Sequence, residues 1–197
     1  MSSIERTAYP RFRHDPNARE LQDLFTPAQE EVGFVRSLIR ENNQHVFAAM
    51  LLLKCLQYLG YFPELSEIPV TVVNDVRICL RLWPDATPAY DQIRTMRRHQ
   101  TAIREYLQLK SRHSHEARKI AVRAVFEAAH VVVNPADLIN AAVEQLRVEQ
   151  CELPSFSTLD RMVKRVRAVV HRHVFTQVMR NLSHGRCSAA QWIAENN

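Results

Sequence analysis

The sequence predicts an all-α protein, and three observations support this. Glycine occurs only three times, at Gly33, Gly60 and Gly185, which is few for a sheet protein with many tight turns. Apolar residues recur mostly at spacings of three and four, the period of a helix that is buried on one side. The only strand candidates are two short β-branched runs, residues 70–73 and 131–133, and each adjoins a proline boundary that also suits a helix end.

The first sixty residues predict an extended arm followed by two helices. The arm covers residues 1–20 and carries Tyr9-Pro10-Arg11-Phe12 as its anchor. Thr26-Pro27 begins a helix that ends near Arg40, because threonine suits the N-cap and proline suits the first helical position. The second helix spans Asn43 to Leu59, before a glycine, and is apolar nearly all round, which predicts the central helix of the fold.

Further helices follow along the rest of the chain. They are expected from Pro69 to Leu82, from Thr87-Pro88 onward, from His115 to Ala129, from Ala136 to Glu149, and from Ser157 onward. Beyond Ser183 the residues are polar and small, and we expect residues 184–197 to form a loosely held tail.

A wholly polar stretch around residues 110–115 predicts a boundary between two small helical modules, residues 1–110 and 111–183. In the second module, two helices flank Leu153-Pro154, and the second of them is basic. This order resembles a helix-turn-helix, whose second helix enters the major groove of DNA. The intervening segment is longer than the three or four residues of the tight motif, so we describe the module as helix-turn-helix-like.

The helix after Ser157 has two chemically different faces. One face is predicted to be apolar and the other basic, with no acid on the basic face. The apolar face holds Leu159, Met162, Val163, Val166, Val169 and Val170, and the opposite face holds Arg161, Lys164, Arg165, Ala168, His171 and Arg172. One side therefore suits a protein core and the other a polyanion. The alternative is a solvated basic face on an ordinary core helix.

Positive charge is concentrated in two segments. Residues 94–123 hold nine basic and two acidic residues, and residues 151–197 hold seven and three. Clustered positive charge is the electrostatic pattern of a nucleic-acid binder, unless folding mixes these segments with the acidic ones. The predicted DNA-contact residues are Arg97, Arg98, Arg104, Lys110 and Arg112 in the first segment, and Arg161, Lys164, Arg165 and Arg172 in the second.

No catalytic or metal-binding pattern is visible, so we predict no catalytic residues, no metal and no cofactor. Phosphate-binding glycine loops, nucleophile elbows and zinc-protease motifs are missing, and the acids form no cluster. No apolar run approaches the roughly 20 residues of a membrane span. The four cysteines are far apart and are typical of reduced thiols in a cytosol.

The order of short motifs resembles the N-terminal region of the replicative transposases of class II transposons, the Tn-three family. The matching pieces include Tyr9-Pro10-Arg11-Phe12, Leu59-Gly60-Tyr61-Phe62-Pro63, Arg97-Arg98-His99-Gln100 and Glu152-Leu153-Pro154 with Ser157-Thr158-Leu159-Asp160-Arg161. Two departures are Val46, where the family commonly has glycine, and the Leu107-Gln108-Leu109 region, which lacks an expected glycine. The resemblance runs from about residue 6 to residue 182.

The resemblance implies a helical protein that binds double-stranded DNA at the terminal inverted repeats of a transposon, in a bacterial cytoplasm and at the nucleoid. It also implies that this chain is not an enzyme, because nothing in it matches the family's Asp-Asp-Glu catalytic domain. Self-association would use C-terminal regions that the chain lacks. The alternative function is a helical protein-interaction module or regulator whose basic faces bind an acidic partner.

Overall fold

A computed structural model describes residues 4–12, 16–39 and 42–195, with side chains described up to Arg180 except at Val178. These residues form eight α-helices and no strand, and the chain is 68% helical, so the predicted all-α class is confirmed. Contacts group the chain into a larger unit, Tyr9–Arg118 with Leu146–Ser155, and a smaller unit, which takes the described residues of Met1–Ala8, Lys119–Gln145 and Phe156–Asn197. Contacts alone do not test which segments fold independently, so the modules 1–110 and 111–183 remain a prediction.

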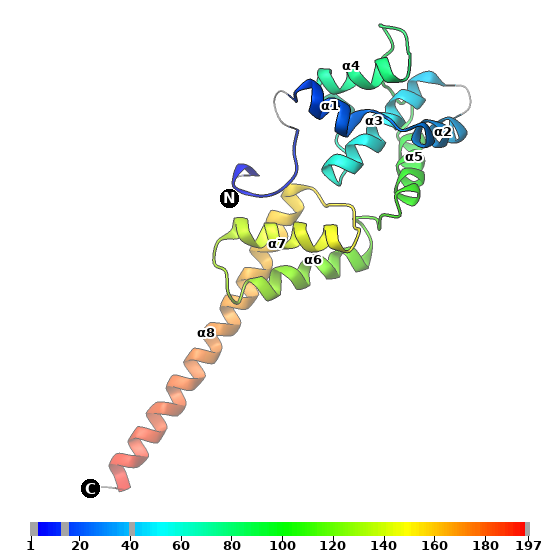
Figure 1. Cartoon of the computed structure of the whole chain (residues 1–197). Coiled ribbons are helices and arrows are strands. Elements are labelled where there is room, and N and C mark those ends of the chain that lie inside the picture. Colours follow the sequence, from blue (N-terminus) through cyan, green and yellow to red (C-terminus); the bar gives the residue numbers. More distant parts are fainter. Residues whose placement is uncertain (1–3, 13–15, 40–41, 196–197) are drawn as a thin grey trace. The chain divides into compact units, whose positions relative to one another are not determined.

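In the larger unit four helices surround a fifth, which is central. They are α1 (Ala18–Phe25), α2 (Gln29–Leu38), α3 (Asn43–Leu59), α4 (Val70–Cys79) and α5 (Ile93–Tyr106), and each of the others packs against α3 (Figure 1). The bounds of α3 agree with the prediction, because both ends carry local stop signals. The Asn42 side chain accepts a hydrogen bond from the His45 N–H, and Gly60 ends the helix with a φ of 77°.

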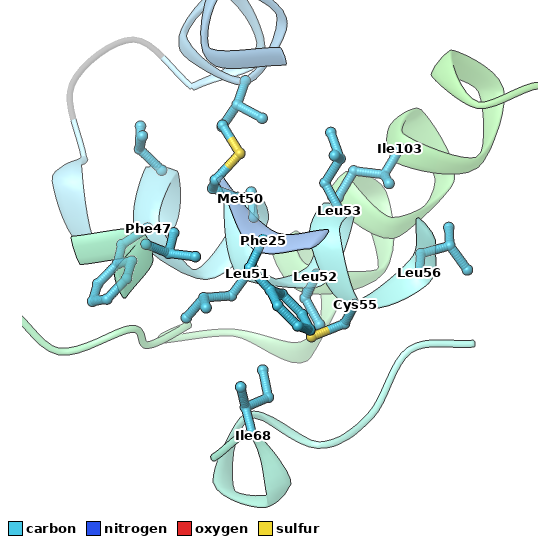
Figure 2. Close-up of a cluster of buried hydrophobic side chains, with 14 of the residues drawn as sticks. Phe25, Phe47, Met50, Leu51, Leu52, Leu53, Cys55, Leu56, Ile68 and Ile103 are labelled. Carbon is cyan, nitrogen blue, oxygen red and sulfur yellow. The ribbon is translucent and has the colours of Figure 1, made fainter. Parts of the chain in front are cut away.

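The central role predicted for α3 is confirmed by its burial. From Val46 to Leu59 only Gln57 and Tyr58 retain appreciable exposure. Figure 2 shows this apolar cluster, in which Phe25 from α1 and Ile103 from α5 lie beside the leucines of α3. Each fully buried leucine or phenylalanine contributes about 1.5–3 kcal/mol relative to an exposed one.

The N-terminal arm is anchored where the sequence predicts. The Tyr9 hydroxyl donates to the Pro154 carbonyl at 2.9 Å, and the Tyr9 ring stacks on Tyr61. Phe12 packs beside Phe25. The prediction missed α1, although its signal is present. The Asn17 side chain accepts a hydrogen bond from the Glu20 N–H, and the Glu20 carboxylate accepts one from the Asn17 N–H.

Several helix ends differ from the prediction. Helix α2 begins at Gln29, because the Glu31 carboxylate caps the Ala28 N–H, and the expected end at Arg40 lies outside the described residues. Helix α4 stops at Cys79, since Arg81 has a φ of 53° and closes a turn. Helix α5 starts at Ile93 and not at Thr87-Pro88. Prolines at 84 and 88 favour extended backbone there.

The smaller unit is built mainly from α6 (His115–Ala128), α7 (Pro135–Val148) and α8 (Phe156–Glu195). Its buried apolar residues include Val125, Leu138 and Val163. The α8 backbone continues as helix through Glu195, and the loosely held tail over residues 184–197 stays a prediction. No proline follows Ser157, and one glycine costs a helix only about 1 kcal/mol.

Candidate nucleic-acid interface

The exposed face of α5 carries a group of arginines in the larger unit. Arg94, Arg97 and Arg98 are three and four residues apart and are exposed, whereas His99 and Ile103 on the opposite side are buried. Within the described part of the chain, no carboxylate lies within ion-pair distance of these three arginines. The sequence prediction named Arg97 and Arg98 but missed Arg94, although the helical spacing places it on the same face.

Two other predicted contacts, Arg104 and Arg112, converge on a buried carboxylate. Glu152 has a side chain only 1% exposed. The Arg104 Nη1 lies 3.2 Å from Glu152 Oε2, and the Arg112 Nε lies 3.5 Å from Oε1. The backbone N–H of Arg112 also donates to Glu152. A buried carboxylate requires such partners, so both arginines have a structural role in the larger unit.

The segment around Glu152 is itself held by backbone hydrogen bonds. Lys110 donates to the Gln150 carbonyl and accepts from the Glu152 N–H, and these bonds form a parallel bridge between Lys110 and Cys151. The Leu153 N–H donates to the Gly60 carbonyl at 2.7 Å. The link between α7 and α8 is therefore buried chain in the larger unit rather than a free turn. Whether the two helices act as a helix-turn-helix stays a prediction.

Two predicted lysines make local ion pairs. Lys110 Nζ lies 2.9 Å from Glu116, and this hydrogen bond raises the pKa of the lysine. Lys164 Nζ lies 2.6 Å from the largely buried Asp160, one helical turn earlier. The exposed Lys110–Glu116 pair contributes little to stability. Both pairs reduce the positive charge that each lysine can offer to a phosphate.

The outward face of α8 is the second basic surface, in the smaller unit. Arg161, Arg165 and Arg172 are exposed there, and Leu159 and Val163 on the other side are buried. The Arg161 Nε donates to the Ser157 carbonyl at 3.2 Å. No carboxylate among the described residues is within ion-pair distance of Arg165 or Arg172. The predicted division of this helix into a core face and a basic face is present in the structure, with one correction. Val169, predicted on the core face, is 59% exposed, because it lies at the flank of the row formed by Val163, Val166 and Val170.

Two histidines of the larger unit, His45 and His99, pack beside the Tyr90 ring. His99 is 1% exposed, its Nδ1 lies 3.1 Å from the Tyr90 hydroxyl, and its ring meets His45 edge-on. Burial, together with the charges of Arg98 and His45, lowers the pKa of His99 to about 4. The imidazole is therefore neutral at pH 7, and it holds the segment before α5 against α3.

The described part of the chain holds no cluster of side chains arranged for catalysis or metal binding. No group of three His, Cys, Asp or Glu side chains there could hold a metal ion, and no helix there is long and apolar enough to cross a membrane. A cavity of about 530 Å³ in the larger unit has no carboxylate or imidazole in its lining. It is lined by Leu56, Gln57, Tyr58, Gly60, Leu107, Leu109, Arg147, Gln150 and Cys151. Burial raises the pKa of the Cys151 thiol, which disfavours a nucleophilic thiolate.

Comparison with known families decides the classification. A family model described as a domain of unknown function (DUF4158) matches residues 1–166. The chain belongs to this family. The DUF4158 match covers all of α5 and the start of α8, up to Val166, so Arg172 is the one predicted contact beyond it. Comparison with curated proteins gave no match.

Proposed function

We propose that this DUF4158 chain binds double-stranded DNA at the terminal inverted repeats of a Tn-three-family transposon, as the DNA-binding part of a transposase. The observation that carries the proposal is the pair of exposed arginine faces on α5 and α8, where no described carboxylate neutralises Arg97, Arg98, Arg165 or Arg172. The occurrence of this domain in Tn-three-family transposases supports the choice of DNA. We assign the chain a binding role rather than a catalytic one.

The local contacts divide the nine predicted residues by role. Arg97, Arg98, Arg161, Arg165 and Arg172 are exposed, and we propose that they contact DNA, together with Arg94. Arg104 and Arg112 hold Glu152, and Lys110 and Lys164 each have an acidic neighbour, so we assign these four a smaller share of the binding energy.

The proposal is tested by fluorescence anisotropy with a terminal-repeat duplex and a scrambled duplex, at several salt concentrations. Counterion release predicts that the logarithm of the binding constant falls linearly with the logarithm of salt, with a slope of about −0.9 per phosphate contacted. The double variant Arg97→Ala/Arg98→Ala should flatten that slope by about two units. Arg165→Ala/Arg172→Ala should act in the same way.

The matched control removes the same charge from other helices of the chain. Arg19 and Arg36 are exposed on α1 and α2, and Arg19 already lies near Asp23. The variant Arg19→Ala/Arg36→Ala should therefore bind with nearly unchanged slope and affinity. Equal losses in the control and in the α5 variant would show nonspecific charge attraction. Failure to bind any duplex at low salt would overturn the proposal and favour an acidic protein partner.

A further inference from the structure

The outward side of α5 carries apolar groups beside its arginines. Ile93, Arg97 and Thr101 follow one another at intervals of four residues, so they are neighbours in one row on the helix surface. All three are exposed, and Ile93 is 66% exposed. On the inner side of α5, His99 and Ile103 are buried. The row therefore presents two groups with apolar surface, and a cation between them, to a partner on this side of the helix.

The hydroxyl group of Thr101 is already engaged within the protein. Its Oγ1 donates to the Arg97 carbonyl at 3.0 Å and accepts from the Arg104 Nη2 at 2.9 Å. Arg104 is in turn held by the buried Glu152. Because a hydroxyl has one hydrogen to donate, Thr101 cannot donate to a partner while its bond to Arg97 is present. The group that this exposed side chain offers to a partner is therefore chiefly its γ-methyl.

Apolar groups among arginines have a specific use on DNA. Contacts to phosphates orient a protein on the duplex but carry no sequence information, which is read from the base edges. In the major groove thymine presents a 5-methyl group, and apolar side-chain groups, including the methyl of threonine, pack against it. Ile93 and Thr101 are eight residues apart, which is about 12 Å along the helix axis, or roughly four base pairs. Both can therefore act within one short stretch of sequence.

We propose that α5 enters the major groove with this row, and that Thr101 and Ile93 contact the 5-methyl groups of thymines. The inference rests on the proposed DNA binding and adds to it the base group that this helix selects. The arginines beside the row supply the attraction to phosphates. Glu105, the next residue at the same spacing, is exposed and negatively charged, and phosphates repel it, so the contact ends before that residue.

The test on the DNA side uses deoxyuridine, which differs from thymidine only by the missing 5-methyl group. The probe is a duplex that the full chain selects from a random-sequence pool, and each of its thymines is replaced by uracil in turn. Loss of one buried methyl group corresponds to about a fourfold loss of affinity. By fluorescence anisotropy we expect such a loss at two thymine positions, which lie within roughly four base pairs of each other.

The test on the protein side removes the matching methyl group. Thr101→Ser deletes only the γ-methyl and keeps the hydroxyl with its bonds to Arg97 and Arg104. At one of the two sensitive positions, this variant should bind the thymine and uracil duplexes equally. Ile93→Ala should do the same at the other position. The matched control is Thr71→Ser, at an exposed threonine of α4, and it should keep the sensitivity of the parent at both positions.

All three changes are at exposed sites, so the variants should melt like the parent. If every uracil duplex binds as tightly as the thymine duplex, the inference is overturned while DNA binding itself stands. Uracil losses that persist in both Thr101→Ser and Ile93→Ala would also overturn it, because DNA shape or another part of the chain would then be responsible. If the chain selects no duplex at all, the proposed DNA binding fails, and this inference fails with it.

Discussion

Replacement of Arg104 by alanine separates a structural arginine from the proposed DNA contacts. In the native chain the Arg104 side chain is 18% exposed, and its guanidinium lies against a Glu152 side chain that is 1% exposed. It also donates to Thr101 Oγ1 at 2.9 Å and lies 5.7 Å from the centre of the Phe62 ring. The substitution removes these contacts and leaves Glu152 with Arg112 as its remaining cation.

The structure sets the size of the effect. Removal of one partner from a buried ion pair costs about 3–5 kcal/mol when the other charge is left alone. Arg112 remains 3.5 Å from Glu152 Oε1, so we expect a smaller loss, of about 2 kcal/mol. For a chain of this size that loss lowers the melting temperature by about 4–8 °C. Arg97→Ala, at an exposed site on the same helix, should change stability by less than about 0.5 kcal/mol.

Two assays on the same samples complete the comparison. Thermal unfolding followed by circular dichroism at 222 nm measures stability, and anisotropy with a terminal-repeat duplex at 15 °C measures binding by protein that is still folded. Arg104→Ala should lose stability and keep its affinity within about twofold, whereas Arg97→Ala should lose affinity and flatten the salt slope by about one unit. The reasoning is wrong if Arg104→Ala melts like the parent, or if it binds DNA as weakly as Arg97→Ala.

Three further predictions concern the larger unit. The pKa of His99 is about 4 in the folded state and 6.5 in the unfolded state, so between these pH values the unfolded state binds one more proton than the folded state. The free energy of unfolding, measured with urea, should therefore fall by roughly 1–3 kcal/mol from pH 7 to pH 4.5. The variant His99→Asn should show a weaker dependence on pH. Gly60→Ala should lower the free energy of unfolding by about 1–3 kcal/mol in the same assay, because φ at Gly60 is 77° and a Cβ there would lie 3.2 Å from Leu153. An unchanged urea midpoint would contradict this prediction. Glu31→Gln should destabilise the chain by about 3 kcal/mol, because it leaves Lys54, which is 7% exposed, without its anion. The double variant Glu31→Gln/Lys54→Met should regain most of that loss. A double variant as unstable as the single one would show that the loss comes from packing and not from the unpaired charge.

The sequence by itself determined the elements whose signals are local. The bounds of α3 follow from its polar start and from Gly60, and its burial follows from an apolar surface that no solvent-facing helix would carry. The two faces of the helix after Ser157 likewise follow from spacing alone. Local signals were overlooked at Asn17 and Glu20, where a reciprocal capping pair starts α1.

Only the tertiary structure decided which basic residues are exposed and unpaired. Arg104 and Glu152 are 48 residues apart, so no pattern within one helix indicates that they meet. Arg104 and Arg97 contribute equally to the positive charge of residues 94–123. In the structure, however, Arg104 is half-buried against a carboxylate, whereas Arg97 faces solvent. Because a buried charge must be paired, the buried Glu152 gives Arg104, which was predicted to contact DNA, a structural role.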